Sequence, residues 1–252
     1  MKGTIAALAP SAEVIDLAHD LPPHGIGESA FVLWSMGRGF PPGTIHVVVV
    51  DPGVGSARAA VILACADGSY LVGPDNGVLT PLAQALGGAT AYRIDRSKVT
   101  DRARVGTTFD GRDLFAPTAA RLANGATPRS LGARWPSFEP SPLPRPTRTR
   151  SELCGAIVHI DHFGNLITNL PSEWLPGNTP FAAVKLGPGR ERTLPVVDHY
   201  AALPIGGTGV LRSSFGTVEI ARREARAAER WPVRPMQPVS VRLVGAHERQ
   251  IR

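Results

Sequence analysis

The sequence predicts an α/β protein of two domains: an N-terminal, mostly parallel sheet with helices on both faces, and a smaller C-terminal antiparallel β domain. Three observations lead to this prediction. Apolar runs typical of buried strands alternate with helical patterns in the first half of the chain. A proline-rich stretch follows. The remainder consists of short alternating segments separated by Gly, Pro and Asn.

Each N-terminal element is recognised by its own pattern. The expected strands are apolar runs bounded by polar or turn residues, at 12–18, 43–51, 59–66 and 69–73. The expected helices carry apolar residues at helical spacing, at 27–37, 78–87 and 111–125. The last of these closes on Asn124 and Gly125, which are typical of a helix C-terminus.

A linker is expected over residues 135–150, because this stretch contains five prolines and almost no apolar pattern. The predicted domains are therefore 1–134 and 151–252. The expected strands of the second domain are short alternating segments, at 155–161, 165–170, 181–187, 207–214, 217–221 and 239–245.

The composition indicates a globular protein that works in the cytoplasm. A chain of 252 residues, 43% hydrophobic and 19% charged, can bury a core, and no apolar run approaches the roughly 18 residues of a spanning helix. Acidic Glu13 and Asp16 argue against a signal peptide. Cys65 and Cys154 allow at most one disulfide and are expected to be two buried thiols. The net charge of +6 comes from scattered arginines without a nucleic-acid-binding motif, so neither nucleic acid nor a membrane is an expected partner.

Two polar segments of the first domain are candidates for a site. Asp51 directly follows an apolar strand, where ligands of open α/β sheets bind, and Arg58 is close enough in sequence to turn back and pair with it. Asp110 lies in TTFDGRD (107–113), at the start of an apolar helix. Strand termination and helix capping are the structural alternatives for these residues, and GPDNG (73–77) has the composition of an ordinary turn.

Two segments of the second domain carry further candidates. His159, Asp161 and His162 resemble metal ligands, but a third well-placed ligand is not evident, so no metal is expected. Asp161 and Asn165 better suit a pocket in which an aromatic stacks on a base and amides read its edge. In LRSSFGTVEIA (211–221), the polar residues serve equally well as turn residues or as ligand contacts.

In this order, DPGVGSAR, GPDNG, TFDGRD, HFGNLITN and SSFGTVEIA resemble the S-adenosylmethionine hydroxide adenosyltransferases, the family related to the fluorinase and chlorinase. The resemblance extends from Met1 to about Ala225. It implies a homotrimer in which each site lies between the α/β domain of one subunit and the small, barrel-like β domain of its neighbour. It also implies hydrolysis of S-adenosyl-L-methionine at the ribose 5′ carbon to adenosine and L-methionine, with no metal or other cofactor.

The resemblance assigns catalytic roles to Asp51 and Arg58, which match the family with the same spacing. Asp110 stands where hydrolytic relatives carry His, and a carboxylate is a weaker base than an imidazole. Asp51 and Asp110 could share a proton, with Arg58 or Arg112 opposing this. Halogenating relatives carry Tyr at the position of Asp51, so its presence argues against a halide as the nucleophile.

Substrate contacts follow from the same matches. Asp161 and Asn165 are expected to face the substrate, with Asn165 reading the adenine edge. Ser214 and Glu219 are expected to bind the methionine carboxylate and ammonium. Phe109 is expected to line the ribose.

Three further matches are expected to shape the site. Gly111 leaves room beside the nucleophile, and the backbone around Arg222 and Arg223 completes the adenine pocket. Relatives also carry a TDFG-like strand before the Met-Lys-Gly with which this chain starts, so that strand and its ribose-binding Asp are expected to be missing and the chain to be less stable or less active. The alternatives are a non-catalytic S-adenosylmethionine or adenosine binding protein and a halide-using adenosyltransferase.

Overall fold

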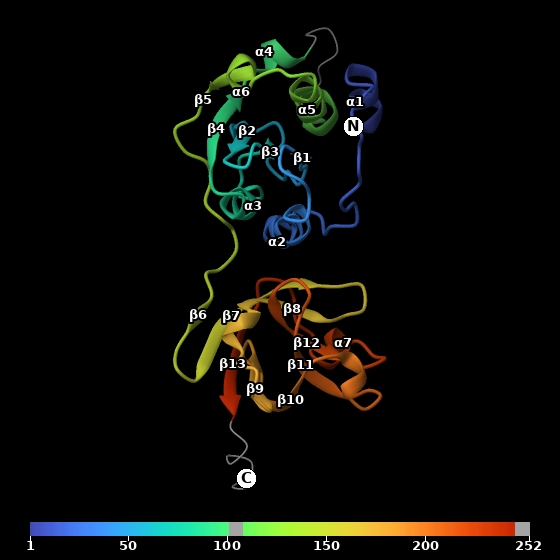
Figure 1. Ribbon diagram of the computed structural model, residues 1–252, viewed down its shortest axis with the longest axis vertical. Helices are drawn as coiled ribbons and strands as arrows, with labels where there is room; N and C mark the ends of the chain where they lie inside the picture. Colours follow the sequence, from blue (N-terminus) through green and yellow to red (C-terminus); the bar gives the residue numbers. More distant parts are fainter. Residues whose placement is uncertain (101–107, 245–252) are drawn as a thin grey trace. The chain divides into compact units, whose positions relative to one another are not determined.

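The computed structural model describes residues 1–100 and 108–244, and the chain divides into two compact units, Met1–Pro142 and Leu143–Arg252 (Figure 1). The division falls within the segment expected to be a linker. Among the described residues, no helix combines the length and apolar character that crossing a membrane requires. The prediction of an α/β fold with a second, β-rich unit is confirmed.

The first unit is built on a five-stranded sheet of order β1-β3-β2-β4-β5. Its strands are β1 (Ile45–Val47), β2 (Ala60–Cys65), β3 (Tyr70–Pro74), β4 (Ala89–Ile94) and β5 (Gly132–Arg134). Only the pairing of β1 with β3 is parallel, and the other three pairings are antiparallel. The described sheet is therefore mixed rather than mostly parallel.

A tight turn between β2 and β3 explains this difference. Gly68 has φ of +90°, and the Asp67 side chain accepts a hydrogen bond from the backbone N–H of Ser69 at 2.9 Å. An Asp-Gly pair between two apolar runs is typical of a hairpin, which makes its strands antiparallel. The prediction of a mostly parallel sheet is therefore wrong for this pair of strands.

The two faces of the sheet are covered by different helices, as Figure 1 shows. Val61 and Leu63 of β2 pack in one core cluster with α2 (Ile26–Gly37) and α3 (Thr80–Ala85). Ile62 faces the opposite way and packs in a cluster with Phe115. Because successive side chains of a strand point to opposite faces, one fully apolar strand supplies both cores.

Other short helices surround this sheet. They are α1 (Lys2–Leu8), α4 (Arg96–Val99), η2 (Gly111–Phe115), α5 (Ala116–Ala123) and α6 (Pro128–Leu131). The helix predicted over 111–125 begins as the π-helical turn η2 and continues as α5, because Pro117 has no N–H to donate to the preceding turn. It ends at Asn124 and Gly125, the latter with φ of +88°, as the sequence predicted.

The strand predicted over 12–18 is wrong. This segment is not a strand, and its side chains Val14 and Ile15 are exposed. Leu17 alone of its apolar residues packs against a core cluster. Apolar alternation alone is therefore not sufficient to make a strand.

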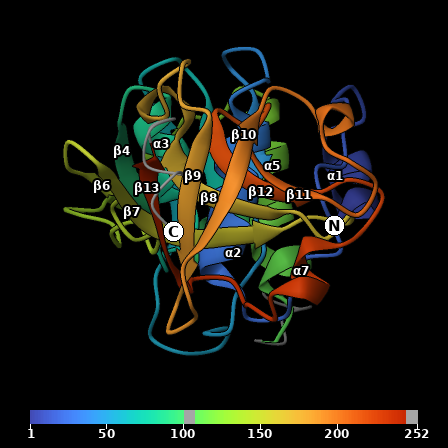
Figure 2. The ribbon, with the colours of Figure 1, turned by 90° about the horizontal axis from the view of Figure 1, so that it is seen from below.

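The second unit is a closed β-barrel, whose strands are yellow to red in Figure 2. The strand order is β13-β9-β10-β11-β12-β8-β7-β6, and an additional β13–β7 pairing closes the ring and leaves β6 outside it. Its strands are β6 (Thr147–Arg148), β7 (Glu152–Ile160), β8 (Leu166–Pro171), β9 (Phe181–Leu186), β10 (Arg192–Val197), β11 (Thr208–Arg212), β12 (Thr217–Arg222) and β13 (Pro238–Val244).

Alternating inward side chains fill the barrel with Ile157, Leu166, Val210 and Ile220. The short helices of this unit are η3 (Ser172–Trp174), η4 (Tyr200–Ala202) and α7 (Ala227–Arg230). Strand β10 was not predicted, because Pro195 interrupts its apolar run. Pro195 lies opposite Phe181 of β9 at the end of that pairing, and Val196 and Val197 pair in parallel with β11.

Candidate active site

Asp51 and Arg58 are brought together by a turn that follows β1. The backbone N–H of Val54 donates to Asp51 and that of Ser56 to Gly53, which folds the chain back on itself. Arg58 then donates from Nε to Asp51 Oδ1 at 2.9 Å and from Nη2 to Asp51 Oδ2. The pairing expected from the seven-residue spacing is therefore present as a two-pronged ion pair.

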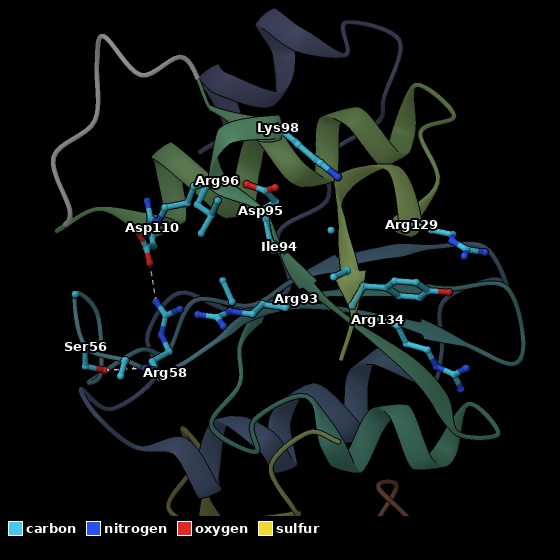
Figure 3. A pocket seen from close by; sticks show the side chains of 17 residues that line it. Ser56, Arg58, Arg93, Ile94, Asp95, Arg96, Lys98, Asp110, Arg129 and Arg134 are labelled. Carbon is cyan, nitrogen blue, oxygen red and sulfur yellow. Dashed lines mark hydrogen bonds and ion pairs between the residues drawn. The ribbon is translucent and has the colours of Figure 1, made fainter. Parts of the chain in front are cut away.

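Asp110 joins this pair from the start of η2. Arg58 Nη2 also donates to Asp110 Oδ2 at 2.7 Å, so one guanidinium holds two carboxylates. The Asp110 side chain is 3% exposed and that of Arg58 12%. The other oxygen of Asp110 accepts from Arg96 Nη2, as Figure 3 indicates by the position of these side chains.

The two carboxylates of this cluster stabilise the charged form of Arg58. Burial alone lowers the pKa of Arg58, but its hydrogen bonds and electrostatic attraction to Asp51 and Asp110 outweigh burial and raise that pKa. Arg58 therefore remains a cation between the two acids.

The cation that joins Arg58 at Asp110 is Arg96, which the sequence interpretation missed. Arg112, considered for that role, instead pairs with the neighbouring Asp113, with 2.6 Å between Nε and Oδ1. The only local signal for Arg96 was its place at the first turn of α4, after the capping Asp95. The position of Arg96 in α4 did not indicate that its side chain bonds to Asp110, which lies outside that helix.

A pocket of about 470 Å³ lies beside these acids. Its lining residues are Met1, Val49, Asp51, Val54, Thr108, Phe109, Asp110, Gly111 and Arg112. Phe109 is 63% exposed, so its ring is available to a ligand. A Cβ on Gly111 would lie 3.1 Å from a methyl of Val49 and 3.2 Å from the sulfur of Met1. Glycine therefore keeps space open next to Asp110.

In the barrel unit, Asp161 and Asn165 form one hydrogen-bonded turn between β7 and β8. The Asn165 backbone donates to Asp161 Oδ1 at 2.8 Å and its side chain to Oδ2 at 2.9 Å. Asn165 is buried, whereas Phe163 at the tip of the turn is 73% exposed. The turn therefore holds an exposed aromatic ring two residues before a fixed amide.

Gly164 is required by the shape of this turn, because it has φ of +80° and a Cβ there would lie 2.7 Å from the Cβ of Arg226. We expect Gly164→Ala to lower the free energy of unfolding by about 1–3 kcal/mol, measured by urea unfolding. Gly177→Ala is the control, since no atom lies within 4 Å of its new methyl group. Equal stability of the two variants would contradict this account of the turn.

Glu219 of β12 is buried and accepts a hydrogen bond from the hydroxyl of Tyr200 at 2.6 Å. Burial raises the pKa of Glu219, the Tyr200 hydrogen bond lowers it, and the charge of Asp161 raises it further, with a net upward shift. Burial and the neighbouring Glu219 also raise the pKa of Tyr200, so its hydroxyl stays a donor. Tyr200 was missed because nothing near it in the sequence resembles a motif.

The raised pKa of Glu219 makes stability depend on pH. Its protonated form is favoured in the folded state, so its contribution is complete below the ordinary glutamate pKa and is lost as the pH rises through the raised value. We expect wild-type stability to fall relative to Glu219→Gln over that window. Urea unfolding of both proteins at several pH values measures this, and a constant difference would contradict it.

The sequence also predicts substrate contacts for Ser214, Arg222 and Arg223, and the two arginines bond to backbone groups of the same unit. Ser214 is exposed in the β11–β12 turn. Arg222 donates to the backbone of Gly206, and the side chain of Arg223 donates to Leu203 O at 3.0 Å. The backbone N–H of Arg223 already donates to Gly207, so that group is used within the fold. Within the described ranges, 1–100 and 108–244, no three His, Cys, Asp or Glu side chains gather as metal ligands would.

This chain belongs to the SAM hydroxide adenosyltransferase family. The N-terminal domain of that family matches residues 1–132 and its C-terminal domain matches residues 155–240. The resemblance predicted from the motifs is therefore confirmed.

Individual relatives agree with this assignment. A Salinispora arenicola protein named (R)-S-adenosyl-L-methionine hydrolase is 39% identical over 92% of this chain and 87% of its own length. A Thermus thermophilus protein of the same name is 35% identical over 95% and 91%. A fluorinase from Actinoplanes sp. is 29% identical over 67% and 65%.

A solved structure from Thermotoga maritima, described as an uncharacterized conserved protein, also resembles this chain. It superposes with a TM-score of 0.89 at 32% identity, over 95% of this chain and 93% of that one. The likeness therefore extends through both units.

Proposed function

We propose that this chain is an enzyme that hydrolyses S-adenosyl-L-methionine to adenosine and L-methionine. The observation that carries the proposal is the buried cluster in which Arg58 holds Asp51 and Asp110 beside a pocket. Relatives covering most of this chain are named as hydrolases of the (R) form of this compound. We therefore propose the (R) sulfonium epimer as the preferred substrate.

The reaction is a displacement at the ribose 5′ carbon. Water attacks this carbon in line with the carbon–sulfur bond, the electron pair of that bond goes to sulfur, and neutral methionine leaves. Asp51 orients the water and accepts its proton, while Arg58 fixes the carboxylate. Asp110, held by Arg58 and Arg96, adds a second acceptor near the attacking oxygen.

Recognition of the substrate is assigned to the barrel unit. The substrate carries a sulfonium and an ammonium, which suit the acidic Asp161 and Glu219, while the buried amide of Asn165 and the exposed ring of Phe163 suit an adenine. Ser214 is proposed to contact the methionine carboxylate. The leaving group is already activated by its positive charge, so we propose that no metal or cofactor takes part and that EDTA leaves the rate unchanged.

The test is to incubate the purified protein with each sulfonium epimer in ¹⁸O-labelled water, with and without chloride. We expect adenosine that carries ¹⁸O in its 5′ hydroxyl, an equal amount of methionine, a faster reaction of the (R) epimer and no effect of chloride. Binding without product would indicate a non-catalytic binding protein. A 5′-chlorinated nucleoside would indicate a halide-using transferase.

We also propose a homotrimer in which each site combines the first unit of one subunit with the barrel of another. Mixing Asp51→Asn and Glu219→Gln proteins after dissociation tests this, because random reassembly leaves about a quarter of such shared sites intact. Recovery of roughly that activity supports sharing, and no recovery contradicts it. The two free cysteines suit a reducing compartment, so we propose that the enzyme acts in the cytoplasm.

A further inference from the structure

A second and larger cavity, of about 1030 Å³, lies in the first unit (Figure 3). Strand β4, the β5 segment, α4 and α6 supply most of its wall, and the turn at 55–58, Ala60, Asp110 and Leu114 supply the rest. It meets the catalytic cluster at Arg58 and Asp110, which also line it. Asp110 is shared with the smaller pocket, but Asp51, Phe109 and the remaining residues of that pocket do not line the larger cavity.

The wall of this cavity is strongly cationic. It contains six basic side chains and two acidic ones: Arg58, Arg93, Arg96, Lys98, Arg129, Arg134, Asp95 and Asp110. Figure 3 shows Arg58, Arg93 and Lys98 reaching in from three separate elements, with Arg129 and Arg134 on the side away from Arg58. A concave surface lined by one sign of charge concentrates its electrostatic potential in the cavity.

Most of these cations are not neutralised by the protein. Arg58 and Arg96 pair with Asp110. Within the part of the chain that the structure describes, Arg93, Lys98, Arg129 and Arg134 form no ion pair with a carboxylate.

Arg96 has unused bonding capacity as well. Its Nη1 is buried and has no hydrogen-bond partner among the described residues. A buried donor without a partner is costly, so an anion that drew this nitrogen into the cavity would be favoured.

The charge of the cavity excludes the proposed substrate as its ligand. S-adenosylmethionine carries a sulfonium and an ammonium against one carboxylate, so a cationic wall repels it. An anion of several charges is attracted instead. The cavity is at the upper end of the roughly 300–1,000 Å³ of small-molecule sites, which is more space than a single oxyanion fills.

We propose that this cavity binds the polyphosphate group of a small phosphorylated metabolite. Arginine and lysine around such a cavity form charge-assisted hydrogen bonds to phosphate oxygens. Arg93 binds the ligand on the side near Arg58, and Lys98, Arg129 and Arg134 bind it along the rest of the wall. Arg96 faces both the cavity and Asp110, so the bound anion competes with Asp110 for its guanidinium.

The test is calorimetric titration of the full chain with tripolyphosphate. We expect saturable binding that Lys98→Gln and Arg93→Gln each weaken by about fivefold to tenfold, the loss typical of one charge-assisted contact. Arg121→Gln is the matched control, because Arg121 is an exposed cation of the same unit that does not line the cavity. Thermal melts check that all variants remain folded, as expected for exposed side chains.

Three results would overturn the proposal. They are the absence of binding to the wild-type chain, affinity unchanged by both cavity substitutions, and an equal loss in Arg121→Gln. A second titration with ATP separates the possible sources of the group. Tighter binding of ATP than of tripolyphosphate supports a nucleotide as the ligand, and equal binding supports recognition of the polyphosphate alone.

Discussion

Replacing Asp51 by Asn is expected to lower kcat for the proposed hydrolysis by roughly 10²–10⁴-fold, the usual contribution of a general base. The amide keeps the size of the side chain and one acceptor for Arg58 Nε, but it cannot take the proton of water. Substrate affinity should change little, because the recognition residues are proposed to lie elsewhere. Steady-state kinetics together with calorimetric titration of the variant measures both quantities.

The matched control for this variant is Asp67→Asn. Asp67 belongs to the same unit, but its carboxylate only bonds Ser69 in the β2–β3 turn. Its kcat should equal that of the wild type. Unchanged turnover in Asp51→Asn would remove Asp51 from the mechanism, even if the overall reaction were established.

Replacing Arg58 by Gln is expected to lower the free energy of unfolding by about 3–5 kcal/mol and to abolish measurable turnover. The reason is that Asp51 and Asp110, with side chains 5% and 3% exposed, would lose the cation between them. Arg96 would still pair with Asp110, so Asp51 would suffer most. Chemical denaturation and the hydrolysis assay measure the two effects.

Arg58→Lys is the informative comparison. It retains the charge but cannot hold Asp51 with two parallel bonds while also reaching Asp110. Its stability should therefore lie between those of the wild type and Arg58→Gln. A glutamine variant as stable as the wild type would show that the three side chains do not depend on one another.

The parts of the fold that sequence reasoning predicted well are those with local signals. The helix at 111–125 has apolar periodicity and a terminal Asn-Gly, and both ends lie close to the predicted positions. The direction of β2 relative to β3 depends on which runs pair, so the same apolar residues suit either a parallel or an antiparallel arrangement. The segment at 12–18 shows the same limit, because apolar alternation does not reveal whether a segment pairs with a strand.

The residues of the candidate site also fall into those that a local sequence signal predicts and those that it does not. Asp51 and Arg58 are close in sequence, so a turn between them could be inferred from spacing and glycine content. Arg96 and Tyr200 reach their partners through contacts distant in sequence, 14 residues from Asp110 and 19 from Glu219. No local pattern encodes such a meeting, and only the folded chain reveals it.

Because Arg96 donates a hydrogen bond to Asp110, a substitution at either position changes the surroundings of the other. A histidine at position 110 would take away the carboxylate that accepts from Arg96 and place a titratable ring beside a fixed cation. The ring would then be discouraged from carrying a proton. An imidazole that is to take up a proton at position 110 therefore requires a substitution at Arg96 as well. A library that varies one position at a time would not contain this double variant.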